Sequence, residues 1–412
     1  MTTRMFRRSG LMGKVRQMQL EAPAPPFGGR LRASVLLALL AALLVATTAA
    51  AGEVPWQEKT LRDRSGASLE DADLSDRNVA AAWREQGDVY VRTSTNGGDS
   101  FMSRELVATD ARYAATEFCG DELWVPYAKR YGDDRQIDLA WRGVDRTGLT
   151  DVPVSFGDGR ARDPDVACTD GRVFVSWLER VGGVHRIRVS DALRSTPVLA
   201  GQAMDLGETF PRRGEPAFAG DGLSRRVFLV TQHGTESEYG EVKVTRFTTG
   251  GPPNHPTTSV TGDVLAQRGL YPQVALSGRK VVAAWASGCG ALKVRVSDDR
   301  GDTWAPTRTL VRQGCNIADV GGKIPISVAI NGQRIFVTYT GDCGDYNSPP
   351  CATHRMVSTT DDFATWNDKQ LIHEGGYASF VTGFVSVGDV GRVRLAMLEG
   401  EDNRYIRFLR RR

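Results

Sequence analysis

Five positions along the chain carry a cation a few residues ahead of a short segment that opens with Pro or a small residue. These cations are Arg112, Arg162, Arg213, Arg268 and Lys323. A guanidinium group binds a carboxylate through two parallel hydrogen bonds, so converging arginines would suit an anionic ligand. The alternative is that they pair with acids such as Asp163 and Glu215, or lie along the surface. Both interpretations stay open here.

Four side chains close to these cations carry groups that could take part in catalysis, namely Asp163, Glu215, Tyr271 and Tyr377. Carboxyl and phenol groups act as acids, bases or nucleophiles, but a structural role is the alternative for each. The five histidines show no metal-binding spacing, and the chain has neither a Gly-rich phosphate loop nor a nucleophile elbow. The sequence therefore predicts no cofactor and no metal.

The elements that must position these residues come from a repeat. Seven apolar segments, most of them ending in a large residue, have their last positions at 83, 127, 177, 231, 285, 339 and 397. This period, with Asn-Gly and Asp-Gly turns nearby, predicts an all-β fold, a β-propeller of four-stranded blades. We favour seven blades, with residues 54–61 completing the last, over six blades and a ragged terminus. Inner strands would then begin around the mouth of a central channel, which brings the five cations together.

A second repeat lies in three turns, at residues 94–101, 297–304 and 359–366, in which hydroxyl residues, Asp or Asn, Gly and an aromatic recur. Asp or Asn closes the turn onto backbone amides and Gly takes a positive φ. The pattern resembles the Asp box of the sialidase (BNR-repeat) propellers. The resemblance implies structural roles away from the ligand face for Ser94, Asn96, Gly98, Ser297, Asp299, Gly301, Trp304, Asp361 and Trp366.

The resemblance does not extend to catalytic residues. A sialidase carries a Phe/Tyr-Arg-Ile-Pro motif near the start of its domain, and residues 53–98 do not contain it. The first interpretation is a propeller that binds carbohydrate or another anionic extracellular ligand at its channel mouth. An exo-acting glycoside hydrolase of the exo-alpha-sialidase type is the alternative, and a cell-envelope interaction scaffold is a further one.

The first 52 of the 412 residues have the features of a secretory signal peptide of bacterial type. Basic residues precede an apolar run at 35–46, and small residues follow it. An uncleaved membrane anchor is the alternative. Without this leader the net charge of +3 becomes −3, so the basicity gives no reason to expect nucleic-acid binding. Residues 53–412 would form one propeller domain.

Six cysteines follow the leader, and an even number in an exported chain favours disulfides over a metal site. Cys343 and Cys351 flank a short loop and would close it. Cys119 and Cys168 fall at the same turn of neighbouring repeats, which predicts a bridge between blades. Cys289 and Cys315 are the remaining pair.

Overall fold

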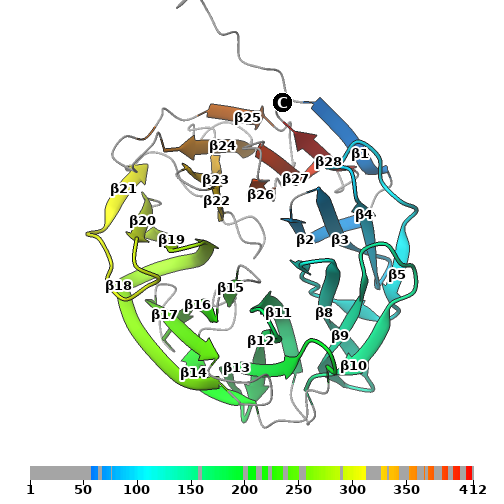
Figure 1. The fold of residues 1–412 in the computed structure, drawn as a ribbon, viewed down its shortest axis with the longest axis horizontal. Coiled ribbons are helices and arrows are strands. Elements are labelled where there is room, and N and C mark those ends of the chain that lie inside the picture. The colour runs from blue at the N-terminus through cyan, green and yellow to red at the C-terminus, as the bar shows by residue number, and fades with distance from the viewer. Residues whose placement is uncertain are drawn as a thin grey trace, which may run out of the picture. The chain divides into compact units, whose positions relative to one another are not determined.

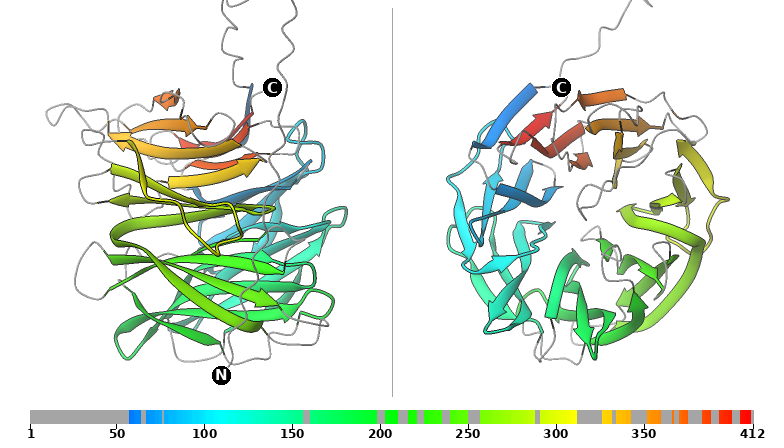
Figure 2. Two further views of the ribbon diagram at one scale, coloured as in Figure 1. Left: turned by 60° about the vertical axis from the view of Figure 1, so that its left-hand side comes forward. Right: turned by 180° about the vertical axis from the view of Figure 1, so that it is seen from behind.

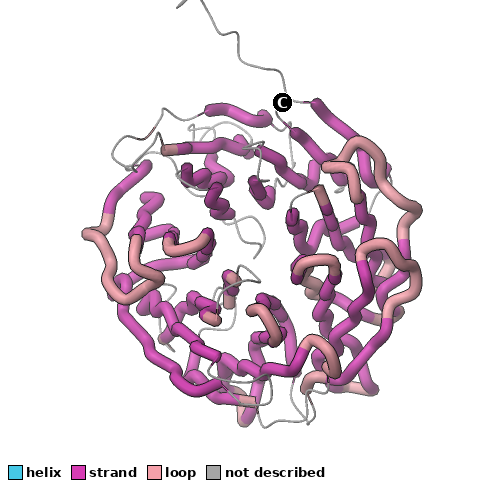
Figure 3. The backbone as a smooth tube through the Cα atoms, viewed as in Figure 1, coloured by secondary structure: helices cyan, strands magenta, loops and turns pink. Residues whose placement is uncertain are grey.

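The structure is a computed structural model. The residues it describes are 57–63, 67–75, 77–155, 160–197, 203–209, 216–220, 225–234, 240–249, 257–287, 291–311, 326–331, 334–342, 352–359, 366, 370–374, 383–387, 393–399 and 405–410. The predicted leader at residues 1–52 lies outside these ranges. Figure 3 shows strands and loops in the described part and no helix, so no helix there could cross a membrane.

The strands form five sheets. The first contains β2 (Ala67–Ser75), β3 (Asn78–Glu85), β4 (Asp88–Ser94) and β5 (Glu105–Ala108). The second contains β6 (Ala111–Arg112), β7 (Glu117–Cys119), β8 (Glu122–Tyr131), β9 (Asp134–Gly143), β10 (Thr150–Pro153), β11 (Arg160–Cys168), β12 (Arg172–Val181), β13 (Val184–Leu193) and β14 (Met204–Thr209). The third contains β15 (Ala217–Ala219), β16 (Arg226–His233), β17 (Gly240–Thr249), β18 (Thr257–Ser277), β19 (Lys280–Ser287), β20 (Ala291–Ser297) and β21 (Arg308–Val311).

The fourth sheet contains β22 (Ile326–Asn331), β23 (Arg334–Asp342), β24 (Ala352–Ser358) and β25 (Gln370–Glu374). The fifth joins both ends of the described chain, and it contains β1 (Gln57–Asp63), β26 (Gly383–Val387), β27 (Val393–Glu399) and β28 (Tyr405–Arg410). In this sheet β1 pairs antiparallel with β28. The segment predicted at 54–61 is therefore a strand, displaced by two to three residues.

Each of the two large sheets consists of two antiparallel meanders. In the second sheet, β11 meets β9 only through the parallel pair Arg160 and Arg135. In the third sheet, the 21-residue strand β18 belongs to both meanders, because its first part pairs with β17 and its second part with β19. The described strands are thus organised in short meanders of successive neighbours, as the repeat predicts.

The first strands of successive meanders contact one another. β2 contacts β7, β7 contacts β11, β11 contacts β15, β15 contacts β18, β18 contacts β22, β22 contacts β26, and β26 contacts β2. Figures 1 and 2 show β2, β11, β15, β22 and β26 nearest a common centre, with β5, β10, β14, β21, β25, β1 and the first part of β18 further out. The seven apolar segments of the sequence are the next strands outward, namely β3, β8, β12, β16, β19, β23 and β27. Trp83 and Trp285, at the ends of two of these segments, are fully buried.

Carboxylates on some inner strands accept hydrogen bonds from groups at the neighbouring inner strand. Asp71 of β2 accepts hydrogen bonds from the Thr116 amide at 2.7 Å and from its hydroxyl at 3.1 Å. Asp165 of β11 accepts one from the amide of Phe218, the middle residue of β15, at 2.6 Å. These bonds provide acceptors for backbone amides at the short strands β7 and β15 that pairing within the sheets does not satisfy. Burial is the main cause that raises the pKa of Asp71 to about 7.

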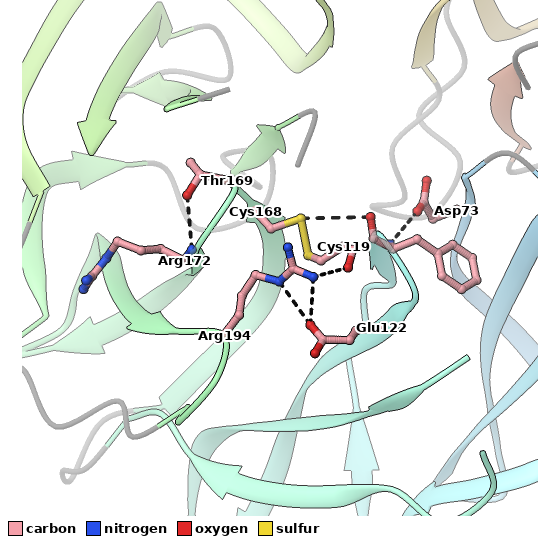
Figure 4. Close-up of a disulfide and its surroundings, with 8 residues drawn as sticks. Asp73, Cys119, Glu122, Cys168, Thr169, Arg172 and Arg194 are labelled. Atoms are coloured by element: carbon pink, nitrogen blue, oxygen red, sulfur yellow. Dashed lines mark hydrogen bonds and ion pairs between the residues drawn. A yellow bond between two sulfur atoms is a disulfide. The ribbon is translucent and has the colours of Figure 1, made fainter. Parts of the chain in front are cut away.

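A disulfide joins Cys119 of β7 to Cys168 of β11, as predicted for neighbouring repeats. Figure 4 shows Arg194 beside it, where the guanidinium contacts both the Cys119 carbonyl and the Glu122 carboxylate. A disulfide fits an oxidising, extracytoplasmic compartment. The other two predicted pairs, Cys289 with Cys315 and Cys343 with Cys351, lie outside the described residues.

Two of the predicted turns have the same hydrogen-bond pattern, and we call them the Ser94 turn (residues 94–101) and the Ser297 turn (residues 297–304). In the Ser297 turn, the Ser297 hydroxyl accepts from the Gly301 amide at 2.8 Å and the Asp299 carboxylate accepts from the Thr303 amide at 2.8 Å. Gly301 has a φ of 75°, which a side chain would resist.

The Ser94 turn repeats these bonds. Ser94 accepts from the Gly98 amide at 2.9 Å, and Asn96 accepts from the Ser100 amide at 2.9 Å. In the third turn, Thr359 pairs with Trp366 as an isolated bridge, and Trp366 packs against the core. Asp361 lies outside the described residues.

Candidate ligand-binding site

The inner strands that follow the predicted cations share a backbone kink. The residues Tyr113, Asp163 and Tyr271 have φ values of 54°, 48° and 51°. At the same points, β6 gives way to β7, and the registers of β11 with β12 and of β18 with β19 shift. A positive φ costs a residue with a side chain about 1–3 kcal/mol, so packing must hold each kink in place. The kink therefore places the preceding residue, Arg112, Arg162 or Leu270, in a similar position in these three strands.

Arg162 precedes one of these kinks on β11, and its side chain is only 21% exposed. Its Nε lies 3.2 Å from Asp163 Oδ2, an ion-pair distance. The orientation is nevertheless wrong for a hydrogen bond, because Nε and Nη2 are buried and bond to no atom of the described chain. A buried donor without an acceptor is costly, and more so on a charged group. Arg162 therefore has two buried donors without an acceptor in the described chain.

Two further arginines are linked to Arg162 through their charges: Arg135 acts on Asp163, the ion-pair partner of Arg162, and Arg112 acts on Arg135. Arg112, at the end of β6, places its Cζ 5.9 Å from the centroid of the Tyr113 ring, within cation–π range. Arg135 is the second residue of β9. Burial lowers the pKa of Arg135, and the positive charges of Arg112 and Arg160 lower it further. Cations held close enough to disfavour one another's charge form a site that an anion would stabilise.

Carboxyl groups share this region. Burial raises the pKa of Asp163 to about 6; the Arg162 charge opposes this shift and the Glu70 charge adds to it. We call Arg112, Arg135, Arg162, Asp163 and Glu70 the mouth cluster, after the predicted channel mouth. Its three guanidinium groups outnumber its two carboxyl groups, so the net charge is positive at neutral pH.

His185 borders the mouth cluster. Burial lowers its pKa to about 4, with smaller contributions from the Arg162 and Arg180 charges, and its buried Nδ1 has no partner in the described chain. His185 and Arg135 occupy the same register in consecutive hairpins, because Arg135 pairs with Arg130 and His185 with Arg180. Sequence reasoning missed both residues and also Glu70. An alignment of the hairpins that follow the apolar segments could have revealed Arg135 and His185.

Of the remaining predicted site residues, the structure describes Arg268 and Tyr271. Arg268 is exposed on β18, and Tyr271 is buried against Leu270 and Val282 in the core. Arg213, Glu215, Lys323 and Tyr377 lie outside the described residues. Of the predicted set, Arg162 and Asp163 lie at an ion-pair distance, and Arg112 is linked to them only through the charge of Arg135. Within the described ranges, no group of three His, Cys, Asp or Glu side chains is arranged to hold a metal ion.

No protein-family model matches the chain, and neither does any curated protein. Among solved structures, the chain is similar to an ulvan lyase of polysaccharide lyase family PL25 bound to -[GlcA(1-4)Rha3S]-, with a TM-score of 0.53 and 8% identity over 85% of this chain and 95% of that one. It is also similar to NanB sialidase from Streptococcus pneumoniae, with a TM-score of 0.45 and 9% identity over 89% of this chain and 72% of that one.

A further similar structure is Trypanosoma rangeli sialidase in complex with sialic acid, with a TM-score of 0.43 and 12% identity over 88% of this chain and 60% of that one. At such identities a likeness concerns the fold alone. The chain therefore has an all-β, propeller-type fold, and any function must be argued from the mouth cluster.

Proposed function

We propose that the protein is an exported seven-bladed β-propeller that binds an anionic carbohydrate at the mouth cluster. The cycle of contacts through β2, β7, β11, β15, β18, β22 and β26 supports seven blades. The pairing of β1 with β28 supports closure of the last blade by the N-terminal strand. The domain boundary near residue 53, the signal peptide before it and the two further disulfides are parts of the same proposal.

One observation carries the binding proposal, namely the buried guanidinium of Arg162 with two donors that bond to nothing in the described chain. A carboxylate or sulfate group would accept from both donors, and Arg135 and Arg112 lie near enough to share its charge. The Asp163 carboxylate already lies 3.2 Å from Nε, so the incoming anion would compete with it or meet it protonated.

The expected effect of removing this guanidinium is large. Arg162→Gln should weaken binding of a glucuronate-containing oligosaccharide by about 10- to 100-fold, since hydrogen bonds to charged groups contribute about 1.5–3 kcal/mol. Isothermal titration calorimetry on the full chain measures this, with the carboxyl-reduced oligosaccharide as the neutral ligand. Arg186→Gln is the matched control, because Arg186 already pairs with Asp205 at 2.7 Å. Equal affinities of wild type and Arg162→Gln would refute the proposal.

A second candidate function, glycoside hydrolysis of the exo-acting sialidase type, is favoured by Asp163. A buried carboxyl group with a pKa of about 6 suits a general acid at mildly acidic pH. Release of a fluorogenic aglycone from an acidic glycoside, lost in Asp163→Asn, would support hydrolysis. Binding without release would favour a lectin-like role. A glycan array on which no sugar binds would favour the interaction scaffold.

A further inference from the structure

A depression of about 360 Å³ lies beside the Ser297 turn. Its lining residues are Arg279, Val296, Asp298, Asp299, Thr303, Trp304 and Ala305. A volume near the lower end of the range for small-molecule sites, about 300–1,000 Å³, suits one small ring. None of these residues belongs to the mouth cluster, so this site is independent of the function proposed above.

The Ser94 turn shows why the depression exists. Both turns hold the chain after the aromatic residue in the same way: Arg295 donates to the Ala305 carbonyl at 2.9 Å, and Arg92 donates to the Met102 carbonyl at 3.0 Å. The backbone is thus equivalent, and the side chains differ. The Met102 sulfur lies 3.5 Å from the Thr93 hydroxyl and covers it. Ala305 is too short to cover the equivalent residue, Val296, which lines the depression instead.

The charges of the lining side chains, together with Lys280, cancel, and the Arg295 guanidinium is held by the Ala305 and Trp304 carbonyls. Asp298 and Asp299 contribute two negative charges, Arg279 contributes one positive charge, and Lys280, whose Nζ lies 3.6 Å from Asp298, contributes another. A charged ligand therefore gains little net attraction, unlike at the mouth cluster. A neutral ligand rich in hydroxyl groups fits better, because carboxylates accept hydrogen bonds and guanidinium donates them.

The apolar part of the lining completes this chemistry. Val296, Ala305 and the partly buried Trp304 offer a non-polar surface beside the charged groups. A pyranose ring has the matching combination, with an apolar face formed by its C–H groups and hydroxyl groups around its edge. We propose that this depression binds a single neutral pyranose unit of a glycan.

Ligand-observed saturation-transfer NMR on the full chain tests this, with the methyl glycosides of glucose, galactose and mannose as probes and methyl glucuronoside as the charged comparison. We expect transfer to at least one neutral glycoside, at least fivefold weaker in Ala305→Met. Met occupies the equivalent position in the Ser94 turn, so the fold should accept it. Absence of transfer to all three neutral glycosides in wild type, or undiminished transfer in folded Ala305→Met, overturns the proposal.

A second variant covers the case in which Ala305→Met does not fold. The double variant Arg279→Gln with Asp298→Asn changes only exposed side chains, and transfer should fall at least threefold. Arg77→Gln is its control, because the Arg77 and Arg279 carbonyls accept equivalent amides in the two turns. Unchanged transfer in the double variant overturns the proposal. Arg162→Gln should leave transfer to neutral sugars intact, which separates this site from the mouth cluster.

Discussion

Asp163 of the mouth cluster and Asp299 of the Ser297 turn are the same residue type in opposite states. Hydrogen bonds from Thr303 and Ser297 lower the pKa of the exposed Asp299 carboxyl to about 2. Burial raises the pKa of Asp163 to about 6. The turn satisfies the polar groups of Ser297 and Asp299 but not Trp304 Nε1, and the mouth cluster leaves two Arg162 donors unsatisfied. The contrast lies in the cause of each pKa shift, which is hydrogen bonding within the turn for Asp299 and burial among charged groups for Asp163.

The largest expected effect tests the packing of the turn. Gly301→Ala should lower the free energy of unfolding by about 2–4 kcal/mol, because an added Cβ would lie 2.5 Å from Phe228 Cε1 and the φ of 75° is unfavourable for alanine. Gly278→Ala is the matched control, since its φ is 58° and no atom lies within 4 Å of the added Cβ. It should cost only about 1 kcal/mol. Urea unfolding measures both, and equal costs would contradict this interpretation.

The sequence predicted the turn better than the mouth cluster, for a physical reason. A turn closes through bonds between residues at most four apart, so the types at Ser297, Asp299 and Gly301 suffice to define it. The apolar segments were recognisable because burial on both faces demands continuous apolar residues. The Cys119 and Cys168 pair followed from their equivalent places in neighbouring repeats.

The mouth cluster instead depends on contacts between repeats. Glu70 and Asp163 are 93 positions apart, and only the stacking of inner strands brings them within electrostatic range. Arg135 lies on β9, which is not an inner strand. A prediction based on the cations that precede inner strands therefore overlooks it. Arg268 satisfied that rule and yet lies exposed on the long strand β18, which two meanders share.

The next largest expected effect is a pH-dependent change in stability caused by Asp163 of the mouth cluster. Because the pKa of Asp163 rises from 3.8 to about 6 on folding, its contribution to stability is complete below pH 4 and lost as pH rises to 6. Across that window the wild type should lose about 2–3 kcal/mol relative to Asp163→Asn, which does not titrate. The groups acting on Asp163 are Arg162, Glu70 and Arg135. Urea unfolding at pH 4 and pH 6.5 measures the difference. An equal change in the free energy of unfolding of both proteins between these pH values would exclude a raised pKa of Asp163.

Asp299 should have the smallest effect, and its contribution to stability should change with pH in the opposite direction to that of Asp163. The pKa of Asp299 falls from 3.8 to about 2 on folding, so its stabilising contribution is present above pH 4 and lost as pH falls towards 2. Asp299→Asn should therefore remove part of the acid sensitivity and change little at pH 7. Asn96 explains this tolerance, since in the Ser94 turn it accepts from the Ser100 amide and donates to the Ser100 hydroxyl at 2.8 Å.

The same urea series, extended to pH 2.5, compares Asp299→Asn with wild type. Free energies of unfolding that nearly coincide at pH 7 and separate as pH falls, with wild type losing more, agree with a carboxylate held ionised by the turn. A difference in the free energy of unfolding that is already large at pH 7 and does not change with pH would mean that the asparagine fails to replace the carboxylate as an acceptor. In that case the two turns would not be equivalent, and the Ser94 turn could no longer serve as the reference for Ala305→Met.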